Sequence, residues 1–181
     1  MHRGRGQGCA VSDPLPRDPI ATAKRNWDRA GWSDVSDSMA AVTSIMRAQQ
    51  ILMGRAEAIV KPFGLTFARF EIIQLLSFSR KEQMPMSKAS RLLQVHPTSV
   101  TSAVTRLEKD GLVRREAHPT DGRTILLTLT DEGRDRARAC AEALNQELFT
   151  DSGLNARDVA SLNRILARFR QKSGDFAAPL D

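Results

Sequence analysis

The order of patterns between residues 86 and 130 constrains the fold of this chain most. Two short segments with helical spacing are separated by a break at Gln94–His96. Two β-rich segments follow, Leu112–Glu116 and Thr124–Thr130, joined by a turn that contains Asp121-Gly122. Asp-Gly pairs favour tight turns between antiparallel strands. This order predicts a helix-turn-helix followed by a protruding β-hairpin, or wing.

A long helix is predicted before this motif. Apolar residues recur every three or four positions from Met39 to Val60, and Pro62 ends the pattern. We expect Ser36 to cap the start. The predicted length of about 26 residues, or about 39 Å, is large for a small domain. Its apolar stripe therefore needs a partner outside a compact core.

Further helices are predicted on both sides of the motif. Residues 66–78 carry regularly spaced apolar side chains and form the helix before it. After the wing, Thr130 is a plausible N-cap of a helix that extends to about Phe149. Gly153 then breaks the chain, and Asn155 starts a last helix with an apolar stripe. The predicted class is mainly α with a small β-hairpin wing (α+β).

The composition agrees with a globular protein that has a polyanionic partner. The chain has 181 residues, 41% of them hydrophobic, and a formal net charge of +6. Positive charge favours nucleic acid or an acidic membrane surface and does not separate the two. No apolar run approaches the length of a membrane span, and no secretory signal is present, so we expect no membrane association and a cytoplasmic location. Two cysteines in a chain of this size indicate neither a disulfide framework nor a metal site.

The second helix of the motif carries the residues most suited to DNA. Its predicted inward face is Val100, Ala103, Val104 and Leu107. Small hydroxyl residues near its N-terminus allow close approach to bases and phosphates, and the helix dipole favours anions there. Serine and threonine are mediocre helix formers, so mere solvation of this face is the weaker alternative. The side chains expected to contact DNA from the motif are Ser87, Thr98, Ser99, Thr101, Ser102, Arg106 and Lys109.

The wing adds positive charge on a protruding hairpin. Positive charge along the hairpin comes from Arg114, Arg115 and Arg123, and it suits a phosphate track or a minor groove. Of these, Arg115 and Arg123 are expected to contact DNA. Asp121 lies two residues before Arg123 and is close enough to orient it through a charge-assisted hydrogen bond. We therefore include Asp121 in the expected DNA-binding set.

The strings Ser-Val-Thr…Arg-Leu-Glu-Lys-Asp-Gly-Leu-Val-Arg-Arg and Pro-Thr-Asp-Gly-Arg-Thr…Leu-Thr-Asp-Glu-Gly resemble the signature of the MarR family of winged-helix transcriptional regulators. With the flanking helices, the resemblance covers about residues 36–172. It implies a homodimer with interlocking terminal helices, which would explain the overlong first helix. It also implies that the helix matching Pro97–Asp110 enters the major groove of double-stranded DNA, and that Arg123 enters the minor groove, steadied by Asp121. Gly122 stands where the family usually has a basic residue.

The resemblance also implies an effector. Similar family members respond to small phenolic or lipophilic ligands, and Met46, Phe67 and Phe70 could line such a pocket, although a plain core is the alternative for each. Another branch senses peroxides through a cysteine early in the first long helix. Neither Cys9 nor Cys140 lies there, so we expect no thiol sensing.

Two other classes of function, an enzyme and an architectural protein, are alternatives to a regulator. An enzyme is not expected, because the three histidines show no nucleophile–base or metal-ligand spacing. We expect no cofactor and no metal. An architectural or partner-binding dimer without ligand response is the second alternative to a ligand-released repressor. The expected segments are residues 1–30 as a disordered leader (or, as an alternative, a DNA-contacting arm), 31–65 as the N-terminal dimerisation helix, 66–130 as the winged helix-turn-helix DNA-binding domain, 131–172 as the C-terminal dimerisation helices, and 173–181 as a tail.

Overall fold

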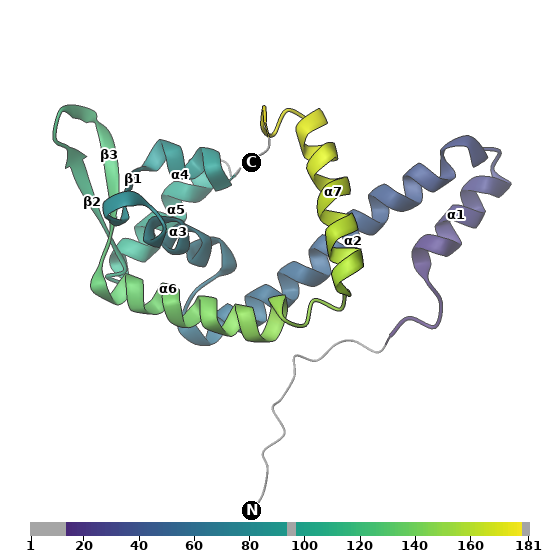
Figure 1. Ribbon diagram of the computed structural model, residues 1–181, viewed down its shortest axis with the longest axis horizontal. Coiled ribbons are helices and arrows are strands. Elements are labelled where there is room, and N and C mark those ends of the chain that lie inside the picture. Colours follow the sequence, from purple (N-terminus) through teal and green to yellow (C-terminus); the bar gives the residue numbers. More distant parts are fainter. Residues whose placement is uncertain (1–13, 94–96, 179–181) are drawn as a thin grey trace, which may run out of the picture. The chain divides into compact units, whose positions relative to one another are not determined.

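The computed structural model describes residues 14–93 and 97–178 (Figure 1). The chain divides into two units, residues 1–144 and 145–181, which are treated separately below. The first unit contains α1 (Pro19–Arg29), α2 (Ser33–Val60), η1 (Lys61–Phe63), α3 (Phe67–Ser77), η2 (Arg80–Glu82), β1 (Gln83–Pro85), α4 (Met86–Leu93), α5 (Pro97–Lys109), β2 (Val113–His118), β3 (Asp121–Leu129) and α6 (Asp131–Leu144). The second contains the π-helical turn η3 (Asn145–Phe149) and α7 (Ala156–Lys172).

The part of the first unit that follows α2, residues 65–130, forms a winged lobe. Helices α3, α4 and α5 pack beside an antiparallel sheet with the strand order β1-β3-β2. Strands β2 and β3 extend as the wing, which projects from the helices in Figure 1. The predicted class, mainly helical with a small β-hairpin wing, is confirmed.

Two details of the sheet differ from the prediction. The strand β1 was not expected, because three residues are too few to show an alternating pattern; it pairs with β3 from Gln83 opposite Thr128. The turn of the wing is also shorter than predicted. His118 pairs with Asp121, so only two residues remain at the tip.

The core of the winged lobe is formed by side chains of one chain. Apolar side chains from α3, α5 and the sheet meet at its centre, and each is at most 6% exposed. Burial of this kind contributes about 25 cal/mol per Å² of apolar surface. The core side chains are Leu65, Phe70, Ile72, Ile73, Leu76, Met84, Ala89, Val100, Val104, Leu107, Leu112, Val113, Leu127 and Leu129.

Helix α6 follows β3, and its first turn is defined by an N-cap and by a close backbone contact. The amide of Gly133 donates to Thr130 Oγ1 at 3.0 Å, which confirms the predicted N-cap. A Cβ atom on Gly133 would lie 2.1 Å from the carbonyl oxygen of Leu112, so only glycine fits this first turn. The backbone of α6 therefore lies directly against the end of α5 and the start of β2.

Helix α2 begins three residues earlier than predicted. Ser36 lies inside the helix and is fully buried, and its hydroxyl donates to the carbonyl of Ser33 at 3.2 Å. It also accepts a hydrogen bond from Lys24 Nζ at 3.1 Å. The capping role expected of Ser36 is wrong, because α1 packs on this face and buries the serine as a bridge between two helices.

The expectation of a disordered leader is wrong for residues 19–29, which form α1. Asp18 caps this helix by accepting from the amide of Ile20 at 2.9 Å, and Pro19 occupies the first helical position. Lys24 then lies 3.3 Å from carboxylate oxygens of both Asp28 and Asp37. A polar contact with α2 thus orders part of a segment that was expected to be disordered. Residues 1–13, including Cys9, lie outside the described residues.

In the second unit, α7 begins as predicted. Asn155 accepts from the amide of Asp158 at 3.0 Å. One side of α7 carries exposed apolar side chains, namely Val159, Leu162, Ile165 and Phe169. Across the part of the chain that the structure describes, no helix is long and apolar enough to cross a membrane.

Candidate nucleic-acid interface

The side chains of α5 divide between an inward and an outward face, as predicted. Pro97 is the first residue of the helix. Val100, Val104 and Leu107 are at most 1% exposed and pack inward. The outward face is exposed and carries Thr98, Ser99, Thr101, Ser102, Arg106 and Lys109. The structure therefore brings all six expected α5 residues to one surface.

A hollow lies along one flank of this outward face, between α5 and the start of α3. Its volume is about 480 Å³. Two guanidinium groups and four hydroxyl groups line it, which is a set of donors suited to phosphate oxygens. The lining residues are Thr66, Arg69, Thr98, Ser99, Ser102, Ala103 and Arg106.

Arg69 lines this hollow but was not among the residues expected to contact DNA. Its Nη1 atom lies 3.0 Å from Asp110 Oδ2 at the end of α5, and its Nη2 donates to the carbonyl of Gly64 at 2.9 Å. Arg69 thus connects the segment that precedes α3 to the end of α5. The partner is 41 residues away along the chain, so no local spacing could have predicted the contact.

The turn of the wing is organised by Asp121. Its carboxylate accepts from the backbone amide of Arg123 at 3.1 Å and from Thr124 Oγ1 at 2.7 Å. These hydrogen bonds, that of Thr124 first, hold the pKa of Asp121 below its ordinary value. These contacts set the backbone of the turn, and the expectation that Asp121 orients the Arg123 guanidinium stays a prediction. The Arg123 side chain is exposed.

Arg115, which is expected to contact DNA, has contacts within the winged lobe. Its guanidinium turns toward α5, where Nη2 donates to Thr105 Oγ1 at 2.8 Å and Nη1 lies 3.4 Å from Glu108 Oε2. Ser87, another residue expected to contact DNA, is an exposed residue in the first turn of α4, which begins at Met86.

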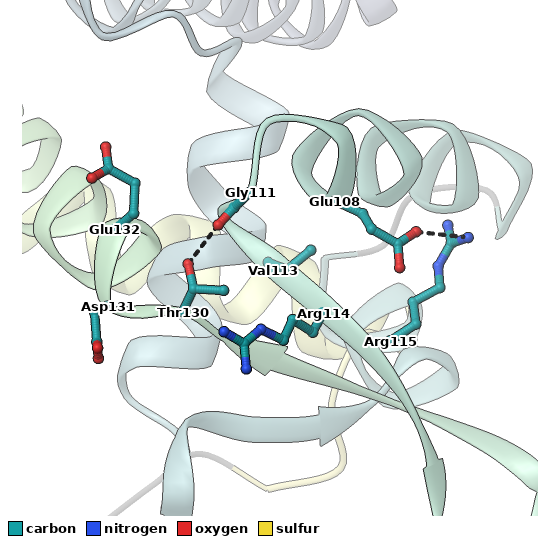
Figure 2. Close-up of a pocket in the computed structure, with 8 residues that line it drawn as sticks. All are labelled: Glu108, Gly111, Val113, Arg114, Arg115, Thr130, Asp131 and Glu132. Atoms are coloured by element: carbon teal, nitrogen blue, oxygen red, sulfur yellow. Dashed lines mark hydrogen bonds and ion pairs between the residues drawn. The ribbon is translucent and has the colours of Figure 1, made fainter.

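A second hollow lies behind the wing, where α5 ends and α6 begins (Figure 2). Its volume is about 660 Å³. Arg114 and Arg115 project from β2 in opposite directions in Figure 2, and Thr130 Oγ1 donates to the carbonyl of Gly111 at 2.7 Å. Three carboxylates, those of Glu108, Asp131 and Glu132, also line it. This mixed charge suits a polyanion less well than the hollow beside α5.

The three residues expected to bind an effector differ in their exposure to solvent. Phe70 is buried in the winged lobe, and its ring centroid lies 5.9 Å from that of the half-buried Phe67. Met46 is 61% exposed on α2. A hollow of about 650 Å³ lies where α2 ends and α3 begins. It is lined by Glu57, Ala58, Lys61, Gly64, Leu65, Thr66 and Arg69.

Cys140 lies on α6 and is fully buried. Desolvation raises the pKa of its thiol to about 11, and the nearby Arg136 lowers it by a smaller amount. A neutral, buried thiol is a poor nucleophile. Among the described residues, no group of three or more His, Cys, Asp or Glu side chains is arranged to hold a metal ion.

Comparison with known proteins identifies relatives of this architecture. The MarR family model matches residues 65–125, which span most of the winged lobe. The crystal structure of Sco5413, a MarR family transcriptional regulator from Streptomyces coelicolor, is 46% identical with a TM-score of 0.72, covering 78% of this chain and 99% of that chain. The transcriptional repressor Rv2887 of Mycobacterium tuberculosis is 30% identical over 130 residues, covering 72% of this chain and 90% of the repressor.

A structure with DNA bound has the same fold. Sco3205, a MarR family transcriptional regulator from Streptomyces coelicolor crystallised in complex with DNA, has a TM-score of 0.68 and 24% identity. The match covers 76% of this chain and 88% of that chain. At this identity the similarity supports the fold alone.

Proposed function

This chain belongs to the MarR family of winged-helix transcriptional regulators, and we propose that it represses transcription by binding a pseudo-palindromic operator as a homodimer. The observation that carries this proposal is the outward face of α5, where small hydroxyl side chains are exposed beside Arg106 and Lys109. MarR family regulators are DNA-binding transcription factors and in general are not enzymes. The name of the relative Rv2887 includes repression of transcription, which supports the same sign of regulation here.

The proposed division of labour follows from side-chain size and charge. Thr98, Ser99, Thr101 and Ser102 are short enough to let α5 approach base edges in the major groove. Arg106 and Lys109 are longer and reach the phosphates, and Ser87 at the start of α4 is placed for a further phosphate contact. At the wing, the exposed Arg123 enters the adjacent minor groove, where negative potential is concentrated.

The homodimer is proposed from apolar surface that one chain leaves exposed. The α2 stripe, defined as Val35, Val42, Ile45, Met46 and Leu52, consists of side chains that are each at least 45% exposed. Helix α7 carries a second exposed apolar side. Contiguous apolar surface of this kind marks a protein interface. Two-fold symmetry would place the two α5 helices about one turn of DNA, or about 10 base pairs, apart.

Release from DNA by a small lipophilic or phenolic ligand is the remaining part of the proposal. Met46, Phe67 and Phe70 are its proposed contacts. The hollow of about 650 Å³ at the end of α2 is lined by none of these three side chains, but its volume lies within the usual range for small-molecule sites, about 300–1,000 Å³. A ligand there would contact the segment that leads into the winged lobe. The alternative is an architectural dimer that lacks this response.

The direct test is selection of bound fragments from genomic DNA, followed by footprinting and a reporter gene under the selected site. We expect a near-palindrome and lower reporter expression when the protein is present. Replacing Ser99 by leucine should remove discrimination between operator and unrelated DNA. Replacing Lys109 by alanine should weaken both similarly and reduce the salt slope by about one. Equal affinity of the unchanged protein for all duplexes would contradict the proposal and favour the architectural alternative.

A further inference from the structure

The guanidinium of Arg115 contacts three residues on one flank of α5. Nη2 donates to Thr105 Oγ1 at 2.8 Å and lies 3.4 Å from the carbonyl oxygen of Thr101. Nη1 forms an ion pair with Glu108 at 3.4 Å. These three partners are spaced by four and three residues, so they lie on the same side of the helix. Arg115 therefore contacts nearly two turns of α5 with a single side chain.

The position of Arg115 in β2 explains this arrangement. Successive residues of a strand point to opposite faces, and Arg114 and Arg115 do so in Figure 2. Arg115 is the third residue of β2 and is paired with Leu127 of β3, which also pairs with Met84 of β1. Its side chain is 28% exposed and its Nε atom is buried. Arg114, by contrast, is exposed.

The flank that Arg115 contacts adjoins the outward face of α5 without covering it. Thr101 contributes its backbone carbonyl, while the expected groove residues Ser99, Ser102 and Arg106 lie further around the helix. A direct contact between Arg115 and a phosphate would require the guanidinium to leave Thr105 and Glu108. A phosphate contact is also charge-assisted, so what opposes the exchange is the loss of the hydrogen bond to Thr105 and the ion pair with Glu108, which already hold the side chain against α5.

We infer that Arg115 is a positioning residue, which holds the recognition helix α5 and the wing in one fixed arrangement so that their contacts with the two grooves form together. This inference rests on the proposed function. It assigns specificity to a residue that does not itself contact DNA. A rigid connection of this kind means that the free energy of wing insertion depends on where α5 lies.

The test is a double-mutant cycle between Arg115 and Arg123, measured as DNA affinity at several salt concentrations on the operator and on an unrelated duplex. With Arg115 present, Arg123→Ala should weaken operator binding by about tenfold or more. In the Arg115→Ala protein the same change should cost less than about threefold, because the wing is no longer held in register with α5. The salt slope of Arg115→Ala should equal that of the unchanged protein, since no phosphate contact is lost.

Two matched pairs of variants separate this role from the alternatives. Arg114→Ala, on the other face of β2, should reduce the salt slope if it contacts a phosphate and should be additive with Arg123→Ala. Thr105→Val, which removes the hydroxyl that accepts from Arg115, should reproduce part of the lost coupling, whereas Thr105→Ser should retain it. Because Thr105→Val leaves the arginine in place, it tests the role even if Arg115→Ala folds poorly.

Additive effects of Arg115→Ala and Arg123→Ala, or a salt slope that falls by about one in Arg115→Ala, would overturn the inference and make Arg115 a DNA contact or a purely structural residue. Failure of the proposed function gives a different result, since the unchanged protein would then bind operator and unrelated duplex equally. The cycle on the unrelated duplex still measures coupling in that case, and additivity there would overturn the inference as well.

Discussion

The winged lobe and the first half of α2 contain similar apolar side chains but bury them differently. In the lobe, Ile73, Leu76 and Val104 are fully buried. On α2, Val42, Ile45 and Met46 are 47–61% exposed. The lobe thus completes its core within one chain, whereas the apolar side chains that α2 buries, Ala56 and Val60, lie in its last turns. Helical periodicity therefore identifies an apolar face but does not specify which chain covers it.

The largest expected effect tests the close packing of the lobe. Gly133→Ala would place a Cβ atom 2.1 Å from the Leu112 carbonyl oxygen, and the backbone would have to move. We expect a loss of about 3 kcal/mol or more in the free energy of unfolding, measured by urea denaturation. Gly54→Ala on α2 is the control, since nothing lies within 4 Å of its added Cβ. It should be neutral or stabilise by up to about 1 kcal/mol. Similar values for both would show that the lobe is not the tighter region.

The second prediction tests the exposed face of α2. Val42→Glu should convert the proposed dimer into a monomer, because two-fold symmetry would place two unpaired carboxylates in one interface. We expect a cost of about 3 kcal/mol or more in dimerisation, measured by light scattering across a concentration series. Gln50→Glu adds the same charge elsewhere on α2 and should leave the dimer intact. A Val42→Glu dimer of unchanged affinity would show that another surface joins the chains.

A third prediction concerns the wing, the most exposed part of the lobe. Arg123→Ala should cost about 1–3 kcal/mol of operator binding, and Arg123→Lys should recover only part of it, because an ammonium lacks the planar fork. Asp121→Asn should weaken binding too, since the carboxylate holds the amide of Arg123 and the hydroxyl of Thr124. Gel-shift titration measures all three. Tighter binding by Asp121→Asn would mean that charge repulsion outweighs the geometry of the turn.

The sign of the pH dependence follows from the pKa of Asp121. Its hydrogen bonds lower this pKa, so the carboxylate remains ionised between about pH 5 and about pH 8. Their contribution is present above the ordinary aspartate pKa and is lost only as the pH falls through the lowered value. The ratio of affinities between Asp121→Asn and the unchanged protein should therefore stay constant over that range.

The smallest effect is expected for the thiols. A Cys9→Ser, Cys140→Ser double variant should keep operator affinity and ligand response within experimental error. Burial raises the pKa of Cys140 to about 11, so its thiol is neutral at physiological pH and should react with iodoacetamide slowly until the chain unfolds. Oxidant-driven release from DNA that disappears in the double variant would instead support thiol sensing.

Local sequence rules predicted those parts of the molecule that neighbours along the chain control. The caps at Thr130 and Asn155, the first-turn proline of α5 and its inward face all follow from contacts within four residues. The same rules were misleading at Ser36, a good capping residue that α1 buries within α2. They could not show β1 either, because its partner strand lies about 45 residues further along the chain.

Periodicity, capping and turn chemistry are local properties, so the amino-acid sequence specifies the helix-turn-helix, the wing and the residue types on the outward face of α5. The side-chain positions of Arg69, Arg115 and Asp121 instead depend on tertiary packing. Arg69 and Arg115 have partners 41 and 10 residues away, and a long, flexible side chain can turn to either face of the element that carries it. Which face it takes depends on the hydrogen-bond acceptors that packing brings near, and a residue's neighbours in sequence do not specify those.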